Sequence, residues 1–391
     1  MSKAYSIVQI GDIIQTKNDK SKQLQTSDYL SNGMLPIVDQ GADLVCGYTN
    51  DLSKMYDKGL PVIVFGDHTL HTKYVDFDFA IGADGTQLVG PKNNDCDIKY
   101  LYYLISRAAK LIGSEGYKRH FRVLKEFETE YINSFPEQQK IATILSSVDN
   151  VIEKTRAQID KLKDLKTGMM QELLTKGIGH TDFKDSPVGR IPISWKAMPL
   201  GTVCELEVGY AFKSEWFSDS GVRLLRGDNV GYGIPTWERI QYLAEEQAKS
   251  YSRYLLDVDD VVIGMDRTFT QSGAKITKIR SSDVPALLVQ RVGKFVPEKY
   301  TMKFLWQLVR SSAFIEGLKA QEKGMDIPHL SKNEILSCVV VLPPFKEQEE
   351  IADILEAQDI LIECEREKLA ALEEMKRALM QDLLLGEVRV G

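Results

Sequence analysis

The sequence is poor in the features that mark secreted and zinc-binding proteins. Only 5 of its 391 residues are cysteine, and no two of them form a C-x-x-C pair. A disulfide framework or a structural zinc site needs cysteines at characteristic spacings. Neither is indicated, and we expect ordinary neutral thiols at Cys46, Cys96, Cys204, Cys338 and Cys364.

Long apolar runs are also missing. No run approaches the roughly 18 residues that a membrane-spanning helix needs. The opening MSKAYSIVQ lacks the charged, apolar and small-residue regions of a signal peptide. We therefore expect a cytoplasmic protein, and the length predicts about two or three domains.

Catalytic motifs are missing as well. The chain contains no G-x-x-x-x-G-K-[ST] or G-x-G-x-x-G loop, no H-E-x-x-H and no serine elbow. LPPF at Leu342–Phe345 faintly resembles the Pro-Pro-aromatic turn of amino-methyltransferases, but a proline stop before a helix is the favoured interpretation. The sequence thus predicts no catalytic residue and no bound cofactor.

Two groups of polar residues are candidate metal ligands. His68 and His71, with Asp67, lie close together in VFGDHTLHTKY, although polar loop residues are the more common explanation of such a pair. A second group of carboxylates lacks a following lysine at nuclease-like spacing: Asp76, Asp78 and Asp84. We predict no metal site.

What the sequence does contain is a repeat. EQQKIATIL beginning at Glu137 returns as EQEEIADIL beginning at Glu347, and the register holds without a gap from Phe135/Phe345 to Leu174/Leu384. Roughly 17 of about 40 paired positions are identical, too many for chance at one fixed spacing. The chain therefore carries an internal duplication.

Each copy of the repeat has the pattern of one long helix. Apolar residues recur at steps of three and four, charged residues fill the other positions, and prolines precede each copy but do not interrupt it. A helix of about 40 residues extends for roughly 60 Å, too far for its apolar stripe to be buried on one small domain. We expect the two helices to pair as an antiparallel coiled coil. The alternative is that each helix packs on its own neighbouring domain.

The segments outside the repeat predict two α+β domains. Short β-rich runs such as LPVIVFGD, DVVIGMD and ALLVQRVGKFV alternate with Gly, Asn, Asp and Ser turns. The expected order is a first domain at 1–134, a long helix at 135–178, a linker at 179–198, a second domain at 199–344 and a second long helix at 345–391. The fold expected is α+β with a pseudo-twofold internal repeat.

A net charge of −7 would by itself disfavour a nucleic-acid binder. The distribution of this charge along the chain removes the objection. Residues 345–391 carry 6 basic and 13 acidic side chains, which equals the whole imbalance. Charge matters where it faces a partner rather than in total. The two domains are therefore free to present local basic surfaces.

Basic and hydrogen-bonding side chains cluster in corresponding parts of the two domains. One cluster runs from Arg107 to Lys125, and the other is DRTFTQSGAKITKIR from Asp266 to Arg280. Lys and Arg neutralise phosphates, and Arg, Gln, His and Thr can contact base edges in the major groove. A solvated surface needs similar residues, so each cluster alone is weak, but their recurrence in repeated domains favours DNA binding.

The order of these parts resembles the specificity subunit of type I restriction-modification systems. The resemblance rests on the two helix starts within Phe135–Leu145 and Pro343–Leu355, on FKDSPVGRIPISW and LGTVCELEVGYAFKS, and on the final MQDLLLGEVRV. It covers essentially the full length. It implies two target recognition domains, each binding one half of a bipartite DNA sequence, with the paired helices fixing the gap between the half-sites.

The resemblance also implies partners. Two methyltransferase subunits that carry S-adenosylmethionine would dock on the helices, and restriction subunits that use ATP and Mg would join that core. No cofactor is then expected in this chain. A different hypothesis is a scaffold protein, whose coiled coil binds protein partners without DNA recognition.

Loop position and chemistry suggest the DNA contacts. For bases we predict His68, Thr69, His71 and Lys73 in the first domain, and Arg267, Thr268, Thr270 and Gln271 in the second. For phosphates we predict Lys118, Arg119, Lys213 and Lys275.

Overall fold

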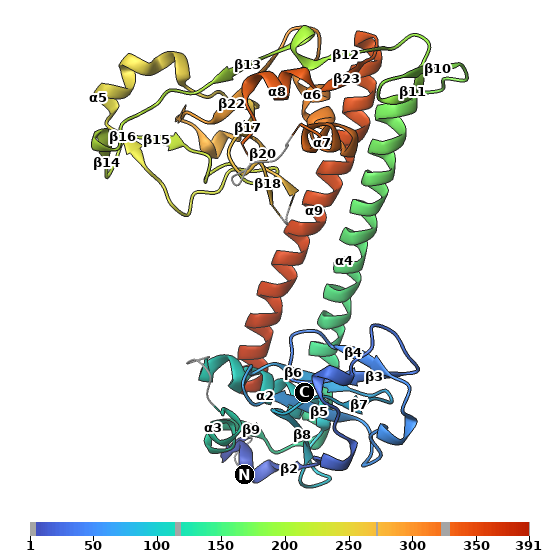
Figure 1. Ribbon diagram of the computed structural model, residues 1–391. Helices are drawn as coiled ribbons and strands as arrows, with labels where there is room; N and C mark the ends of the chain where they lie inside the picture. The colour runs from blue at the N-terminus through green and yellow to red at the C-terminus, as the bar shows by residue number, and fades with distance from the viewer. Residues whose placement is uncertain (1–4, 114–118, 271–272, 322–328, 391) are drawn as a thin grey trace. The chain divides into compact units, whose positions relative to one another are not determined.

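The computed structural model (Figure 1) describes residues 5–113, 119–270, 273–321 and 329–390. The chain divides by its internal contacts into two units. Unit 1 comprises Met1–Ala157 with Arg366–Gly391, and unit 2 comprises Gln158–Glu365. Each unit thus contains one globular domain and one half of each long helix, which differs from the sequence expectation of separate helical domains.

Unit 1 is built on a four-stranded antiparallel sheet and a smaller three-stranded sheet. The first sheet has the order β2 (Ile14–Thr16), β8 (Thr86–Pro91), β5 (Val62–Gly66) and β6 (Thr72–Val75). The second has the order β4 (Gly47–Thr49), β3 (Leu35–Val38) and β7 (Ala80–Ile81), with β3 and β7 parallel. Helix α2 (Ile98–Ile112) packs on the first sheet and buries its apolar face there. Short α1 (Ile10–Ile13) and α3 (Phe121–Glu126) flank the pair β1 (Tyr5–Gln9) and β9 (Glu128–Ile132).

Unit 2 repeats this plan with longer connections. Its four-stranded antiparallel sheet has the order β13 (Cys204–Val208), β22 (Val292–Pro297), β17 (Val261–Gly264) and β20 (Ile276–Lys278). Its other main sheet has the order β14 (Phe217–Ser218), β16 (Tyr242–Leu243), β15 (Val222–Leu225) and β21 (Ala286–Leu288). The terminal pair is β12 (Lys196–Pro199) with β23 (Val339–Leu342), and the helices are α5 (Glu245–Ala248), α6 (Met302–Val309), α7 (Ser312–Lys319) and α8 (Lys332–Ser337).

The main sheets of the two domains therefore correspond. The four-stranded sheets share one order, and each second sheet contains one parallel pair, β3 with β7 and β15 with β21. Each domain also closes with one antiparallel pair joined to the start of a long helix. The predicted α+β class and internal repeat are confirmed, and the duplication extends through domains whose sequences look unrelated.

The predicted linker is not without structure. Residues 179–198 contain a hairpin of β10 (Phe183–Ser186) and β11 (Gly189–Pro192) and most of β12. Gly189, with φ of 98°, follows the turn and pairs with Ser186. Such a positive φ is available to glycine without steric cost, so the turn residues that suggested a linker in fact close a hairpin.

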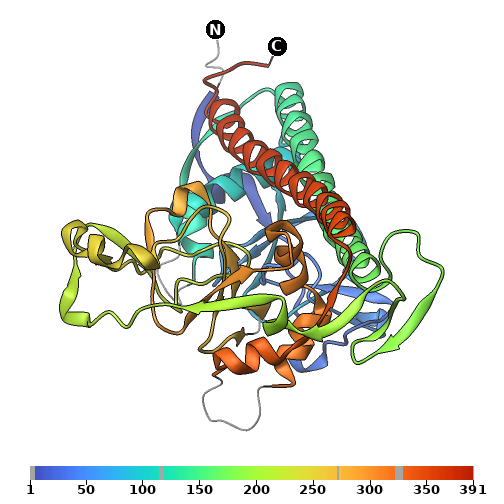
Figure 2. The same ribbon diagram turned by 90° about the horizontal axis from the view of Figure 1, so that it is seen from above.

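The long helices are α4 (Phe135–Lys176) and α9 (Phe345–Leu384), and within each unit they run antiparallel (Figure 2). In unit 1, Lys376 bonds Asp149 and Glu373 bonds Arg156. In unit 2, Glu365 bonds Gln158 and Asp359 bonds Lys166. Partner numbers fall along one helix as they rise along the other, which confirms the predicted antiparallel pairing.

The repeated glutamine explains why the helix start occurs twice. Gln138 is fully buried. Its side-chain oxygen accepts from the N–H of Asp97, the N-cap of α2, at 2.7 Å. Its side-chain nitrogen donates to the carbonyl of Ile132 at 2.8 Å. Gln348, also buried, does the same for Thr301, the N-cap of α6, and for the carbonyl of Pro343. Each glutamine thus joins a long helix to its domain.

The repeated glutamate joins each helix start to the segment that follows the other helix. Glu137 forms a bidentate pair with Arg389, both contacts at 2.6 Å. Glu347 accepts from the indole of Trp195 at 2.8 Å and contacts His180 at 2.8 Å. Both carboxylates hold the chain just after it leaves the partner helix, and the duplicated positions therefore serve equivalent roles.

Two reciprocal ion pairs connect the helices. Asp149 and Lys166 of the first copy meet Lys376 and Asp359 of the second, each pair at 2.5 Å. Tyr103 also donates to Asp149, and Gln307 to Asp359. Burial alone would raise the pKa of Asp359, but the hydrogen bond and charge of Lys166, together with the charge of Arg310 and the hydrogen bond from Gln307, leave the pKa below its ordinary value. This contribution to stability is present above about pH 4 and is lost as the pH falls through the folded pKa.

Replacing the buried glutamine tests the junction between helix and domain. Gln138→Ala leaves a buried N–H and a buried carbonyl without their partner. We expect the free energy of unfolding to fall by about 2 kcal/mol, measured by urea unfolding. The neighbouring exposed Gln139 is the matched control, and Gln139→Ala should change stability by less than about 0.5 kcal/mol. Equal effects of the two substitutions would contradict the assigned role.

Replacing the two lysines separates the reciprocal ion pairs. The Lys166 side chain is 7% exposed and that of Lys376 is 24% exposed. Lys166→Met should cost about 3 kcal/mol, because it leaves a partly buried carboxylate without its main counter-charge. Lys376→Met should cost about 1 kcal/mol, because water reaches that pair. Urea unfolding at pH 7 gives both values, and the exposed Lys161→Met supplies the baseline. A larger loss for Lys376 would refute this ranking.

Candidate nucleic-acid interface

One connection occupies the same place in both domains. Strands β5 and β17 are buried along their whole length, and they end at Gly66 and Gly264. The chain then enters GDHTLH before β6 in unit 1, and GMDRTFT before β20 in unit 2. Most of the predicted base contacts belong to these two connections, which we call the β5–β6 loop and the β17–β20 loop. The structure therefore brings the two predicted groups to corresponding positions.

In unit 1 the β5–β6 loop rests on Gln40. The Gln40 side-chain oxygen accepts from the N–H of His68 at 3.1 Å, and its backbone carbonyl accepts from the Thr69 hydroxyl. His71 is exposed and lines a cavity of about 410 Å³, together with Lys110 of α2 and the start of β6. Thr69 and His71 thus lie at the surface, while His68 is half-buried.

In unit 2 the β17–β20 loop presents Arg267. This residue is exposed and has φ of 46°, a conformation that costs energy for a side chain other than glycine. Thr270, also exposed, bonds the hydroxyl of Tyr232 on a neighbouring segment. A short ribbon of β18 (Phe269–Thr270) and β19 (Gly273–Ala274) follows Arg267 and stiffens the loop.

Two of the predicted base contacts are buried. Lys73 lies in β6, where its ammonium group donates to the carbonyl of Asp39 at 2.8 Å. Thr268 is fully buried, and its hydroxyl donates to the carbonyl of Gly264. Both side chains point into the protein and donate to backbone carbonyls there. They support the structure around the loops and are not exposed to a DNA duplex. The sequence could not distinguish them from exposed neighbours, because alternation in such short strands is ambiguous.

The predicted phosphate contacts are dispersed. Arg119 is exposed beside the start of α3. Lys213 is exposed, lies over the ring of Trp216 and pairs with Glu215 at 3.6 Å. Lys275 is half-buried and reaches the carbonyl of Gly227 at 3.4 Å. Lys118 and Gln271 lie outside the described residues.

A cavity of about 410 Å³ lies beside the β17–β20 loop. Its charged lining contains four cations and two carboxylates: Arg226, Arg267, Lys275, Arg291, Asp228 and Asp266. Arg226 pairs with Asp228 at 3.3 Å and Arg291 with Asp266 at 2.7 Å. After these pairs are formed, the cavity keeps a positive excess from Arg267 and Lys275, together with the exposed amide of Gln290. Such a surface suits phosphate or an acceptor-rich base edge.

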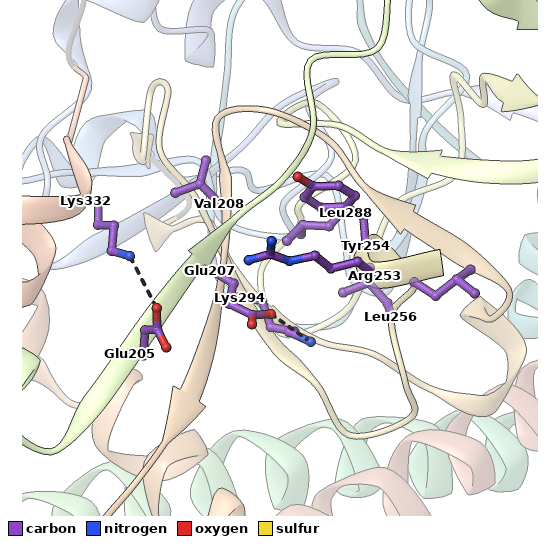
Figure 3. A pocket seen from close by; sticks show the side chains of 10 residues that line it. Glu205, Glu207, Val208, Arg253, Tyr254, Leu256, Leu288, Lys294 and Lys332 are labelled. Atoms are coloured by element: carbon purple, nitrogen blue, oxygen red, sulfur yellow. Dashed lines mark ion pairs between the residues drawn. The ribbon is translucent and has the colours of Figure 1, made fainter. Parts of the chain in front are cut away.

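A second cavity in unit 2 differs in its charge balance (Figure 3). It encloses about 120 Å³ between β13, β22 and the segment around Tyr254. Two of its lysines face acidic partners, Lys294 with Glu207 at 3.3 Å and Lys332 with Glu205 at 3.7 Å. Both lysines of this cavity are therefore neutralised locally, and its remaining cation, Arg253, lies over the ring of Tyr254.

Three residues beside these two loops were not among the contacts predicted from the sequence. Gln40 supports the loop of unit 1, while Gln290 and Arg291 lie in the turn between β21 and β22 beside Arg267. They come from segments distant in the chain, and only the sheet order brings them together. The sequences DQG and VQR are typical of turns and could have been noted. A turn sequence does not show which distant loop the turn will contact.

Across residues 5–113, 119–270, 273–321 and 329–390, no group of three or more His, Cys, Asp or Glu side chains is placed to hold a metal ion. In the same described part of the chain, no helix is both long and apolar enough to cross a bilayer.

Comparison with known proteins identifies the family. The model of the type I restriction modification DNA specificity domain matches residues 3–164 and again 192–374. The two matches cover most of the chain and one falls on each repeat. The chain belongs to this family.

Similar curated proteins are specificity subunits. That of the type I restriction enzyme MjaVIII of Methanocaldococcus jannaschii is 35% identical over 306 residues, 76% of this chain and 72% of the relative. The EcoR124I/EcoR124II specificity subunit of Escherichia coli is 22% identical, across 90% of this chain and 86% of the relative. DNA sequence recognition is the role of this family, and the named relatives are its non-catalytic specificity subunits.

Solved structures show the same fold. The S subunit of a type I restriction-modification system from M. genitalium matches with a TM-score of 0.63 at 16% identity, covering 97% of this chain and 96% of that one. A chain from a study of complex assembly in the type I R-M system matches with a TM-score of 0.56 at 14% identity, covering 98% of each. These structures show the fold, and it is the family membership that disfavours the scaffold hypothesis without DNA recognition.

Proposed function

We propose that the two domains bind the two halves of one bipartite, asymmetric double-stranded DNA target. The observation that carries this proposal is the correspondence of the β5–β6 and β17–β20 loops. One fold presents GDHTLH in unit 1 and GMDRTF in unit 2 at the same place. A shared scaffold with different hydrogen-bonding side chains is what recognition of two different half-sites requires.

The proposed contacts follow from exposure and charge. In unit 1, His68, Thr69 and His71 meet base edges and Arg119 meets phosphate. In unit 2, Arg267 and Thr270 meet base edges, with Gln290 beside them, while Lys213 and Lys275 meet phosphates. Arg267 has the strongest support, because it is exposed, strained and lies at a cavity with excess positive charge. Lys73 and Thr268 hold their loops from inside.

We further propose that the helices fix the spacer between the half-sites and bind two methyltransferase subunits. Two exposed apolar positions support the docking proposal, because they recur in both copies: Val151 with Leu361, and Leu165 with Met375. Unit 1 contains Val151 and Met375, and unit 2 contains Leu361 and Leu165. Each lies within one turn of a lysine–aspartate pair. Two equivalent apolar surfaces suit two copies of one partner.

S-adenosylmethionine would then be bound by the methyltransferase subunits. Restriction subunits, if they join this core, would supply the ATP and Mg-dependent steps. The specificity subunit contributes only the choice and placement of DNA.

Arg267→Ala tests base recognition by unit 2. If Arg267 donates to a base edge, its loss should cost about 1–3 kcal/mol and relax one position of one half-site. The measurement is binding of a DNA library by the complex with its methyltransferases, followed by sequencing. Arg253→Ala, at the separate cavity of Figure 3, is the control. Uniform weakening across all sequences would reassign Arg267 to phosphate, and absence of any salt-sensitive DNA binding by the unaltered complex would reject the proposed function.

Charge on the repeated apolar positions tests methyltransferase docking. Leu165→Glu should remove one methyltransferase from the complex, and Met375→Glu should remove the other, because a charge is costly to bury in an apolar contact. Native mass spectrometry measures the stoichiometry. Thr167→Glu places the same charge two residues further along the helix, at an exposed position, and should keep two copies bound. Retention of both copies by the double variant Leu165→Glu/Met375→Glu would exclude these surfaces.

A further inference from the structure

Both units contain an aspartate at the base of the DNA-facing loop that is bound by a distant histidine. We call this contact the loop clamp: Asp67 with His120 in unit 1, and Asp266 with His329 in unit 2. The partners are 53 and 63 residues apart in the chain. His120 directly precedes α3, and only Leu330 and Ser331 separate His329 from α8, so each histidine lies just before the last short helix of its domain.

In unit 1 the loop clamp is buried. The carbonyl of Asp67 accepts from the His120 N–H at 2.8 Å and is 3.0 Å from its Nδ1. The Asp67 carboxylate accepts from the N–H of Phe121 at 2.8 Å. Both Asp67 and His120 are over nine-tenths buried. The residue that follows β5 is therefore held against the start of α3.

In unit 2 the same connection is made with different atoms. His329 Nδ1 lies 2.7 Å from the Asp266 carboxylate, and the Leu330 N–H donates to the carbonyl of Met265 at 2.9 Å. The second carboxylate oxygen of Asp266 accepts from Arg291 at 2.7 Å. One aspartate thus joins the β17–β20 loop, the turn after β21 and the segment before α8.

The position of the loop clamp in the chain points to its role. In each unit it is adjacent to the residues proposed to contact bases, with His68 after Asp67 and Arg267 after Asp266. The two domains share little sequence, yet both keep an aspartate and a histidine in contact here. Recognition of a base edge requires donors held within a fraction of an ångström of their acceptors. A mobile loop would discriminate less between bases, because its donors could also form hydrogen bonds with incorrect bases.

We propose that the loop clamps are specificity-positioning elements that act without touching DNA. They fix the direction in which each loop presents its base-contacting side chains, and so each clamp controls the selectivity of one half-site. This inference rests on the proposed function of the two domains. It adds four residues, none of them chosen for base contact, to the determinants of sequence choice.

The decisive experiment replaces the histidine of unit 2, which is the more exposed of the two. The complex containing His329→Ala methylates or binds a DNA library with both half-sites randomised, and sequencing gives the preference at every position. We expect discrimination to fall about tenfold, the scale of a single base mismatch, in one half-site only. The other half-site in the same molecule is the internal reference and should be unchanged.

Three further variants separate positioning from folding. His329→Asn keeps a hydrogen-bond donor for the Asp266 carboxylate and should restore most of the discrimination. Asn333→Ala, an exposed change at the start of the same helix, should leave both half-sites unaltered. His120→Ala in unit 1, which removes the ring contact to the Asp67 carbonyl, should relax the opposite half-site from the one affected by His329→Ala. Thermal melting of each complex confirms that the domains remain folded.

Unchanged specificity of His329→Ala, equal losses in both half-sites, or failure of His329→Asn to restore discrimination would each overturn the inference. These outcomes differ from a failure of the proposed function. In that case the unaltered complex itself would show no bipartite sequence preference.

Discussion

The structure depends on pairing two copies of one helix antiparallel within the same chain. When a sequence pairs with its own copy in this way, each position of the first copy meets a fixed position of the second, and the reciprocal contact must also occur. The lysine–aspartate pairs show this reciprocity, with Lys166 on Asp359 and Lys376 on Asp149. Because the repeat duplicates one lysine and one aspartate that can pair, the same ion pair joins the helices once in each unit.

The helix starts extend this logic to the domains. Gln138 and Gln348 hold the first turn of α2 and α6, and Glu137 and Glu347 hold the segments that leave the opposite helix. Duplication can keep such contacts only if both partners are retained in each copy. The domain loops are under no such requirement, because they meet an external ligand rather than each other. This explains why the helices have kept their sequence while the domains have diverged.

The candidate site was only partly accessible to prediction. The sequence pointed to both loops that we propose face DNA, because DHTLH and DRTF concentrate hydrogen-bonding side chains after a buried strand. It could not show that Lys73 faces Asp39 and Thr268 faces Gly264, since the face of a residue near a strand end depends on register. It also missed Arg291 and the two loop-clamp histidines, which reach the loops from segments far away in the chain. Gln40 was missed for the same reason.

The sequence by itself determined the duplication, the length and apolar periodicity of both helices, the α+β class of the domains and the family. Each of these follows from the local spacing of residues or from similarity between sequences, and neither requires a tertiary structure. Only the tertiary structure decided which charges are neutralised, which predicted contacts are buried and which distant residues support the loops. The reason is physical: burial and ion pairing depend on segments brought together by the sheet order, and no local pattern encodes the identity of a neighbour 50 or more residues away.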